Sequence, residues 1–206
     1  MKLLTASTSG ASGRGDTRAR ILDAAERLVQ QRGFNGFSYA TVAAELGVTK
    51  AALHHHFPSK TALGEALITR YSERFAAALE AIDATDPQAR AKLAAYVELY
   101  ARVLREGRMC LCGMLAAEYE TLAPPIRQAV LEFLEHNESW LAGVLEQGRA
   151  DGSMRFSGSA AETADSILGG LEGTMLVARS YGDPVRFEAT AARLLAGLTG
   201  EQGARS

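Results

Sequence analysis

The residues best suited to chemistry lie close together between Thr49 and His55. This segment carries a hydroxyl group on Thr49, an ammonium group on Lys50, a methyl group on Ala52 and imidazoles on His54 and His55. Ammonium and imidazole groups donate hydrogen bonds to base edges and phosphates, and an alanine methyl can contact the methyl of thymine. We therefore predict that residues 49–55 form a short helix whose outer face enters the major groove of DNA.

Metal binding is the alternative chemistry for the consecutive histidines His54, His55 and His56. Successive residues on a helix point about 100° apart, whereas metal-binding histidine pairs on helices are normally four residues apart. Three adjacent imidazoles therefore cannot converge on one ion, and we expect neither a metal site nor another cofactor. His56 precedes Phe57 and is expected to have a structural role.

The sequence around this segment predicts two short helices joined by a tight turn. Ser38 and Thr49 are good N-cap residues, and Gly47 can adopt the backbone conformation that a turn requires. Ala43 is small enough to let the two helices cross closely. This arrangement is the geometry of a helix-turn-helix.

The rest of the chain is also expected to be helical. Ala, Leu, Glu and Arg are abundant, and apolar residues recur every three to four positions, so the sequence predicts an all-α fold of about nine helices. The expected helices cover residues 16–32, 38–46, 49–55, 59–82, 88–105, 110–121, 125–151, 159–181 and 184–198.

These helices divide into two domains. We expect a flexible N-terminal arm over residues 1–15 and a helix-turn-helix domain over 16–62. Helix 59–82 then leads into a regulatory and dimerisation domain over 83–200, and residues 201–206 form a frayed tail. No signal peptide is recognisable, and no apolar run reaches the roughly 18 residues that a transmembrane helix needs. We therefore expect a cytoplasmic protein without a membrane partner.

Charge is unevenly distributed between the two ends of the chain. Residues 1–60 carry eight Lys and Arg against four Asp and Glu, whereas the remainder carries 14 basic and 20 acidic residues. A basic N-terminal third on an acidic body suggests that this end of the protein meets a polyanion.

A series of residues at fixed spacings runs through the first third of the chain. Its members are Arg20-Ile21-Leu22-Asp23-Ala24-Ala25, Gly33-Phe34, Gly36-Phe37-Ser38, Val42-Ala43, Leu46-Gly47-Val48-Thr49, Leu53 and His56-Phe57-Pro58-Ser59-Lys60. With these residues, segment 17–63 closely resembles the N-terminal domain of the tetracycline-repressor (TetR) family. The resemblance implies a DNA-binding regulator that acts as a homodimer on double-stranded operator DNA.

The resemblance also implies roles for individual residues. Ser38 and Tyr39, at the start of the second helix, would contact the phosphate backbone, and Lys60 would hold a further phosphate. Arg14 and Arg18 would add phosphate or minor-groove contacts from the arm. The residues that would face the groove are Thr49, Lys50, Ala52, His54 and His55.

The two imidazoles are a departure from the family pattern. The position of His54 is often tyrosine in this family, and that of His55 is commonly aromatic. Histidine makes the expected contacts more polar and sensitive to pH.

Glycines in segment 159–181 point to a dimer interface. Gly169, Gly170 and Gly173 stand beside Leu168 and Leu176. A glycine inside a helix costs about 1 kcal/mol relative to alanine, and close approach of another helix is one reason to tolerate it. The equivalent helices of the TetR family form a four-helix dimer bundle, so we expect Leu168, Gly169, Gly173 and Leu176 at the interface. Internal packing or a ligand is the alternative explanation for these glycines.

Aromatic and methionine residues in the C-terminal domain are candidates for the wall of a ligand pocket. Such residues suit apolar ligands, although most of them are expected to be ordinary core. The ligand would be a small-molecule inducer whose identity the sequence leaves open. The candidates are Tyr96, Tyr100, Met109, Met114, Leu115, Tyr119, Phe133, Trp140 and Met175.

Cys110 and Cys112 suggest a second kind of switch. Some TetR-family members that sense electrophiles or oxidants carry a cysteine at the start of the equivalent helix. Arg105 and Arg108, together with a helix N-terminus, would lower the pKa of a nearby thiol. The alternative is that both cysteines are small buried hydrophobic residues.

The sequence therefore favours a repressor that an inducer releases from DNA. In this hypothesis the inducer changes the tilt of helix 59–82 and so the spacing of the two reading helices. A thiol-dependent helical enzyme is a remote alternative, because no acid–base pair or Cys/His/Asp arrangement is evident. A helical adaptor that uses the domain for protein contacts is a third.

Overall fold

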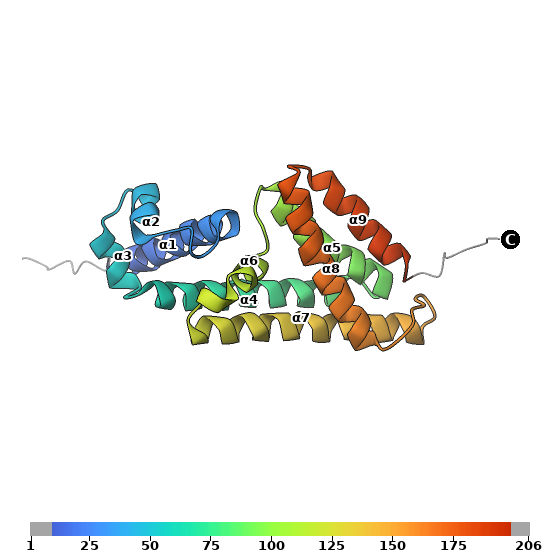
Figure 1. The fold of residues 1–206 in the computed structure, drawn as a ribbon. Coiled ribbons are helices and arrows are strands. Elements are labelled where there is room, and N and C mark those ends of the chain that lie inside the picture. The colour runs from blue at the N-terminus through green and yellow to red at the C-terminus, as the bar shows by residue number, and fades with distance from the viewer. Residues whose placement is uncertain (1–9, 199–206) are drawn as a thin grey trace, which may run out of the picture.

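The computed structural model describes residues 10–198, and nine α-helices and one short 3-10 helix account for most of them (Figure 1). No helix in this range is long and apolar enough to cross a membrane. The helices are α1 (Gly10–Arg32), α2 (Tyr39–Leu46), α3 (Lys50–His56), α4 (Lys60–Thr85), α5 (Ala89–Arg105), α6 (Leu111–Ala117), α7 (Pro124–Ala150), α8 (Ala160–Ser180) and α9 (Pro184–Ala196), with the 3-10 helix η1 (Tyr119–Thr121) after α6.

The long helix α4 connects the two ends of the molecule. In Figure 1, α1, α2 and α3 gather at one end of it, and α5, α8 and α9 lie toward the other end. Helix α7 packs along α4, and α8 packs between α7 and α9. The all-α prediction, with a helix-turn-helix followed by a larger helical domain, is confirmed.

Three N-cap side chains fix the starts of the helices that shape the helix-turn-helix. The hydroxyls of Ser38, Thr49 and Ser59 accept hydrogen bonds from the backbone amides three residues later, at 3.2, 3.2 and 3.0 Å. Gly47 ends α2 in the left-handed conformation, with φ of 65°, which glycine adopts without a steric penalty. The predicted N-caps Ser38 and Thr49 are confirmed.

Two helix boundaries differ from the prediction by four residues or more. Helix α1 begins at Gly10 rather than at Asp16 or Thr17, because no proline interrupts residues 10–15 and a nucleated helix extends readily. The predicted arm is therefore helical over residues 10–15, and the remainder of the arm and the tail lie outside the described residues. The helix expected over 110–121 ends at Ala117 and continues as η1, since the prolines at 124 and 125 disfavour helical geometry just before them.

Candidate functional site

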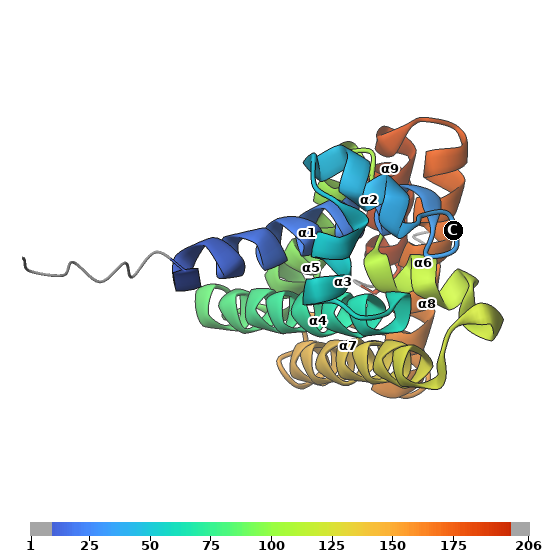
Figure 2. The same ribbon diagram turned by 90° about the vertical axis from the view of Figure 1, so that its left-hand side faces the viewer.

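The short helix α3 has one buried anchor and an exposed polar face. Leu53 is fully buried beneath the helix, whereas Lys50, His54 and His55 are exposed. Seen from this end of the molecule, α2 and α3 lie in front of α1 and α4 (Figure 2). Thr49 is exposed at the start of α3 and Ala52 is half-buried. The predicted groove-facing residues thus lie on or at the start of one short helix at the end of the molecule.

The hydroxyl of Tyr39, which we predict to contact the phosphate backbone, is hydrogen-bonded within the protein. Tyr39 shares its single hydroxyl proton between the carbonyl oxygens of Phe57, at 2.8 Å, and Ser59, at 2.6 Å, and burial raises the pKa of the hydroxyl. Its ring lies 4.7 Å from that of His54. Tyr39 therefore ties α2 to the turn between α3 and α4. Its contact with the phosphate backbone stays a prediction.

Lys60 contacts the segment between α1 and α2, and its predicted phosphate contact stays a prediction. Its ammonium group donates to the carbonyl oxygen of Phe37 at 2.8 Å and lies over the rings of Phe34 and Phe37, 4.8 and 4.5 Å from their centroids. Partial burial lowers its pKa. Lys60 therefore stabilises the apolar segment between α1 and α2 through one carbonyl hydrogen bond and two cation–π contacts.

Ser38 and Arg18, two further candidates for contacts with the DNA backbone, are exposed. The hydroxyl of Ser38 caps α2 and is hydrogen-bonded to that of Thr41. Arg18 lies on α1 with its guanidinium 5.1 Å from the ring centroid of Phe57, next to the end of α3. The side chain of Arg14 lies outside the described residues.

The predicted pocket aromatics form a packed cluster rather than an open cavity. Tyr96 donates to Asn137 at 2.9 Å and is hydrogen-bonded to Tyr100 at 3.1 Å. The ring of Trp140 stacks on Tyr96, with centroids 5.4 Å apart, and Phe75 contacts Tyr96 edge-on. Burial raises the pKa of both tyrosines. These residues therefore form the polar centre of the C-terminal core.

Other candidates for the pocket wall are buried in the core or contact other side chains. Met175 is fully buried, and Leu115 is buried as well. The sulfur of Met114 lies 3.7 Å from the guanidinium of Arg179. Tyr119 is half-buried, and the guanidinium of Arg127 lies 5.3 Å from its ring centroid. Of the predicted wall residues, Phe133 and Met109 line the hollows described next.

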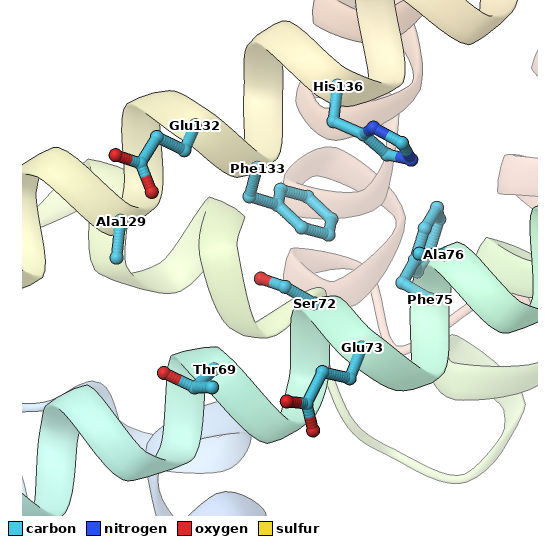
Figure 3. Close-up of a pocket in the computed structure, with 9 residues that line it drawn as sticks. All are labelled: Thr69, Ser72, Glu73, Phe75, Ala76, Ala129, Glu132, Phe133 and His136. Atoms are coloured by element: carbon cyan, nitrogen blue, oxygen red, sulfur yellow. The ribbon is translucent and has the colours of Figure 1, made fainter.

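One hollow lies between α4 and α7 and has a volume of about 370 Å³ (Figure 3). Phe75 and Phe133 form its apolar floor, and Glu73, Glu132 and His136 stand at its rim. The other lining residues are Thr69, Ser72, Ala76 and Ala129. A second hollow, of about 270 Å³, lies between α6, α7 and α8 and includes Met109 and Glu172. Either could admit a small ligand into the helical core.

Both cysteines are reduced and buried. The hydroxyl of Tyr71 donates to the sulfur of Cys110 at 3.7 Å, and burial raises the thiol pKa of Cys110 and Cys112 well above its usual value. Arg105 pairs with Glu98 and Glu188 instead of a thiol. The expected lowering of the pKa is wrong. Burial and a raised pKa reduce the reactive thiolate, so electrophile sensing is not favoured.

The glycine-rich face of α8 is open in the monomer. A Cβ atom at Gly169 or Gly173 would meet no atom within 4 Å, so internal packing does not explain either glycine. Leu176 is 49% exposed. Leu168, in contrast, is buried inside the protomer, because it belongs to the inward stripe of α8 with Leu171 and Met175, so its placement on the outer face is wrong.

Contacts between the two domains were missed by the sequence analysis. Arg179 of α8 donates to the carbonyl oxygens of Gln30, at 3.2 Å, and of Gln31. Both carbonyls belong to the last turn of α1. The carboxylate of Glu118 accepts from the amides of Phe34 at 2.6 Å and Asn35 at 3.1 Å. A helix end leaves carbonyls unsatisfied, so a partner was to be expected there, but no local pattern identifies a residue some 150 positions away.

Comparisons with known proteins agree with this geometry. Residues 21–67 match the model of bacterial regulatory proteins of the tetR family, and residues 87–194 match that of the tetracyclin repressor-like C-terminal domain. A solved TetR-family regulator from Agrobacterium tumefaciens superposes with a TM-score of 0.88 at 29% identity, covering 91% of this chain and all of that one.

Two characterised relatives extend the match. The transcriptional repressor NemR of Escherichia coli is 28% identical over 156 residues, which cover 74% of this chain and 78% of NemR. The transcriptional repressor KstR2 of Rhodococcus jostii is 30% identical over 150 residues, covering 72% of this chain and 71% of KstR2. With both domains matched and the helix-turn-helix in place, the chain belongs to the TetR family of DNA-binding transcriptional regulators.

Proposed function

We propose that this protein is a homodimeric repressor that a small molecule bound in the C-terminal domain releases from operator DNA. The observation that carries the proposal is the exposed face of α3, with Lys50, His54 and His55 presented by a capped helix-turn-helix. That NemR and KstR2 are repressors supports repression rather than activation. The chain is proposed to act by binding and not as an enzyme.

Dimerisation supplies the specificity that one short helix lacks. Paired recognition helices of helix-turn-helix dimers read half-sites about 34–36 Å apart, which is one turn of DNA. The open glycine face of α8 and its exposed apolar residues support a dimer formed through α8 and α9. Relative rotation of the two protomers would change the spacing of the α3 helices and so the affinity for DNA.

Replacing Lys50 with alanine is expected to weaken operator binding about tenfold and to reduce the salt dependence. An ammonium group on base or phosphate acceptors contributes about 1–3 kcal/mol, and a phosphate contact releases about one counterion. Fluorescence anisotropy on DNA flanking the protein's own gene, at several salt concentrations, measures both. Arg102→Ala, an exposed arginine on α5, is the matched control and should bind as the unmodified protein does. Equal affinities for both variants would contradict the proposed role of α3.

The inducer signal would reach the DNA-binding domain through α6 and α8. Arg179 caps the last turn of α1, and the amide of Met109, just before α6, donates to Gln30 at 3.2 Å. Glu118, just after α6, holds the amides that follow α1. Both ends of α6 and one residue of α8 thus hold the same end of α1. A ligand that moves these helices would move the recognition helix with them.

Removal of the Arg179 side chain is expected to loosen the contact between α8 and the C-terminal end of α1. In Arg179→Ala the last carbonyls of α1 lose their cap, so amide hydrogen exchange over residues 30–35 should accelerate several-fold, while the core of α4 keeps its protection. Hydrogen exchange followed by mass spectrometry measures the change. Arg102→Ala should leave residues 30–35 unchanged. If Arg179→Ala also left them unchanged, α8 would not hold α1.

A further inference from the structure

The hollow between α6, α7 and α8 combines apolar walls with acidic groups. Its volume is about 270 Å³. Glu138 of α7 and Asp165 and Glu172 of α8 contribute carboxylates, and none of the ten described residues that line it is basic. The apolar part of the lining consists of Met109, Ala116, Leu134, Leu168 and Leu176, with Gly113 and Gly169.

Glu172 carries an unsatisfied acceptor in this hollow. Its Oε1 atom is buried and has no hydrogen-bond partner. The carboxylate lies against Gly113, where a Cβ atom would collide with Oε2, so glycine at this position makes room for the acid. The thiol of Cys110, which is a weak donor, is a hydrogen-bond partner of this carboxylate, and it leaves Oε1 unpaired. A buried acceptor without a partner costs free energy that a bound donor can recover.

The charge balance of the hollow favours a cation. Burial raises the pKa of Glu172 to about 7, and burial together with Asp165 raises that of Glu138. The lining residues supply no positive charge to offset these carboxylates. An anion would be repelled by three acids, and a neutral apolar molecule would leave Oε1 unpaired. A primary or secondary ammonium supplies both the opposite charge and N–H donors.

We propose that this hollow binds a primary or secondary amine with an apolar body, and that Glu172 receives the ammonium group. The apolar walls would cover the hydrocarbon part, and Glu138 and Asp165 would add long-range attraction. The proposal that this hollow is the inducer site rests on the proposed function. The binding itself does not depend on DNA.

The position of Glu172 would connect such a ligand to the DNA-binding domain. Arg179 lies seven residues later on α8 and therefore on the same face of the helix, two turns along. Gly113 is in α6, and Met109 just before α6 is hydrogen-bonded to the end of α1. An amine held between Glu172 and α6 would thus touch both elements that hold α1.

The test uses three probes that share one body and differ in charge. 3-Phenylpropylamine, 3-phenylpropanol and 3-phenylpropionate are titrated into the DNA-free, full-length protein by isothermal calorimetry. We expect the amine to bind at least tenfold more tightly than the alcohol, and the propionate not to bind. Glu172→Gln should weaken amine binding at least tenfold. Glu132→Gln, which removes the same charge from the α4–α7 hollow, should leave it unchanged.

Several outcomes would overturn the site. Equal affinity for amine and alcohol, or an unchanged affinity in Glu172→Gln, would show that the carboxylate does not select the ligand. No amine binding at millimolar concentration would contradict the site. Operator affinity is measured separately. Amine binding without DNA release would support the site and contradict its inducer role, whereas failure to bind any DNA would contradict the proposed function alone.

Discussion

Replacing Val177 with glutamate is expected to separate the dimer and to weaken operator binding by at least about 100-fold. Two linked half-site contacts typically exceed the affinity of one by two to four orders of magnitude, and a monomer loses that gain. A carboxylate at the centre of an apolar interface would be desolvated without a partner in both protomers. The variant should therefore bind DNA as a weak monomer.

The expectation rests on the surface that α8 and α9 leave open. Val177 is 49% exposed, Tyr181 is 68% exposed and Val185 is 67% exposed, and all lie where α8 passes into α9. Gly169 and Gly173, on the preceding turns of α8, face open space. Exposed apolar residues beside helical glycines suit close packing of a second copy, as a monomer seldom leaves such a face bare.

Analytical ultracentrifugation gives the oligomeric state, and anisotropy on operator DNA gives the affinity. Leu131→Glu is the matched control, because Leu131 is 40% exposed on α7, outside α8 and α9. It should remain a dimer with unchanged DNA affinity. If the Val177→Glu protein were still a dimer, the interface would lie on another face. If it were a monomer that bound operator DNA tightly, dimerisation would not be needed for DNA binding.

Helix positions were predictable because their signals are local. Ser159 and Glu162 form the reciprocal capping box that begins α8, and the hydroxyls of Ser38 and Thr49 cap the two helices of the DNA-binding motif. Each of these signals depends on residues within three positions of one another. The bounds of α8 and α9 accordingly fall within two residues of the prediction.

Side-chain roles were less predictable because they depend on distant partners. Tyr39 and Lys60 were expected to contact phosphate, and no sequence signal indicated that the polar end of each also donates to a backbone carbonyl. Leu168 could have been placed correctly, since it shares a helical spacing with Leu171 and Met175. Glu172 was overlooked although it is an acid between those two residues, and an acid beside an apolar stripe is a signal worth following.

The stability of the ligand-free protein is expected to fall as the pH rises from about 5 to 8. Glu172 has a pKa of about 7 when folded, against a usual value of 4.5. Between these values the folded state binds more protons than the unfolded state, so raising the pH favours unfolding. The shift corresponds to a loss of roughly 1–3 kcal/mol by pH 8. Below about pH 4.5 the acid is protonated in both states and contributes no such loss.

The groups that face Glu172 do not reverse this direction. Tyr71 on α4, Tyr100 on α5 and Cys110 before α6 all have raised pKa values and keep their protons in this range. Glu138 on α7 also has a raised pKa, which adds to the same trend. Glutamine at position 172 removes the ionisation but keeps the shape. Glu172→Gln should therefore be more stable than the unmodified protein at pH 8 and similar to it at pH 4.5.

Urea unfolding at several pH values measures the effect, with Glu132→Gln as the control that keeps the original pH profile. Identical profiles for Glu172→Gln and the unmodified protein would mean that Glu172 is hydrated when folded. The same experiment bears on the proposed ligand. An ammonium group on Glu172 would favour the ionised carboxylate, so saturating amine should flatten the fall in stability above pH 6. The carboxylate of Glu172, which lowers the stability of the ligand-free protein, would then be the group through which the protein responds to the amine.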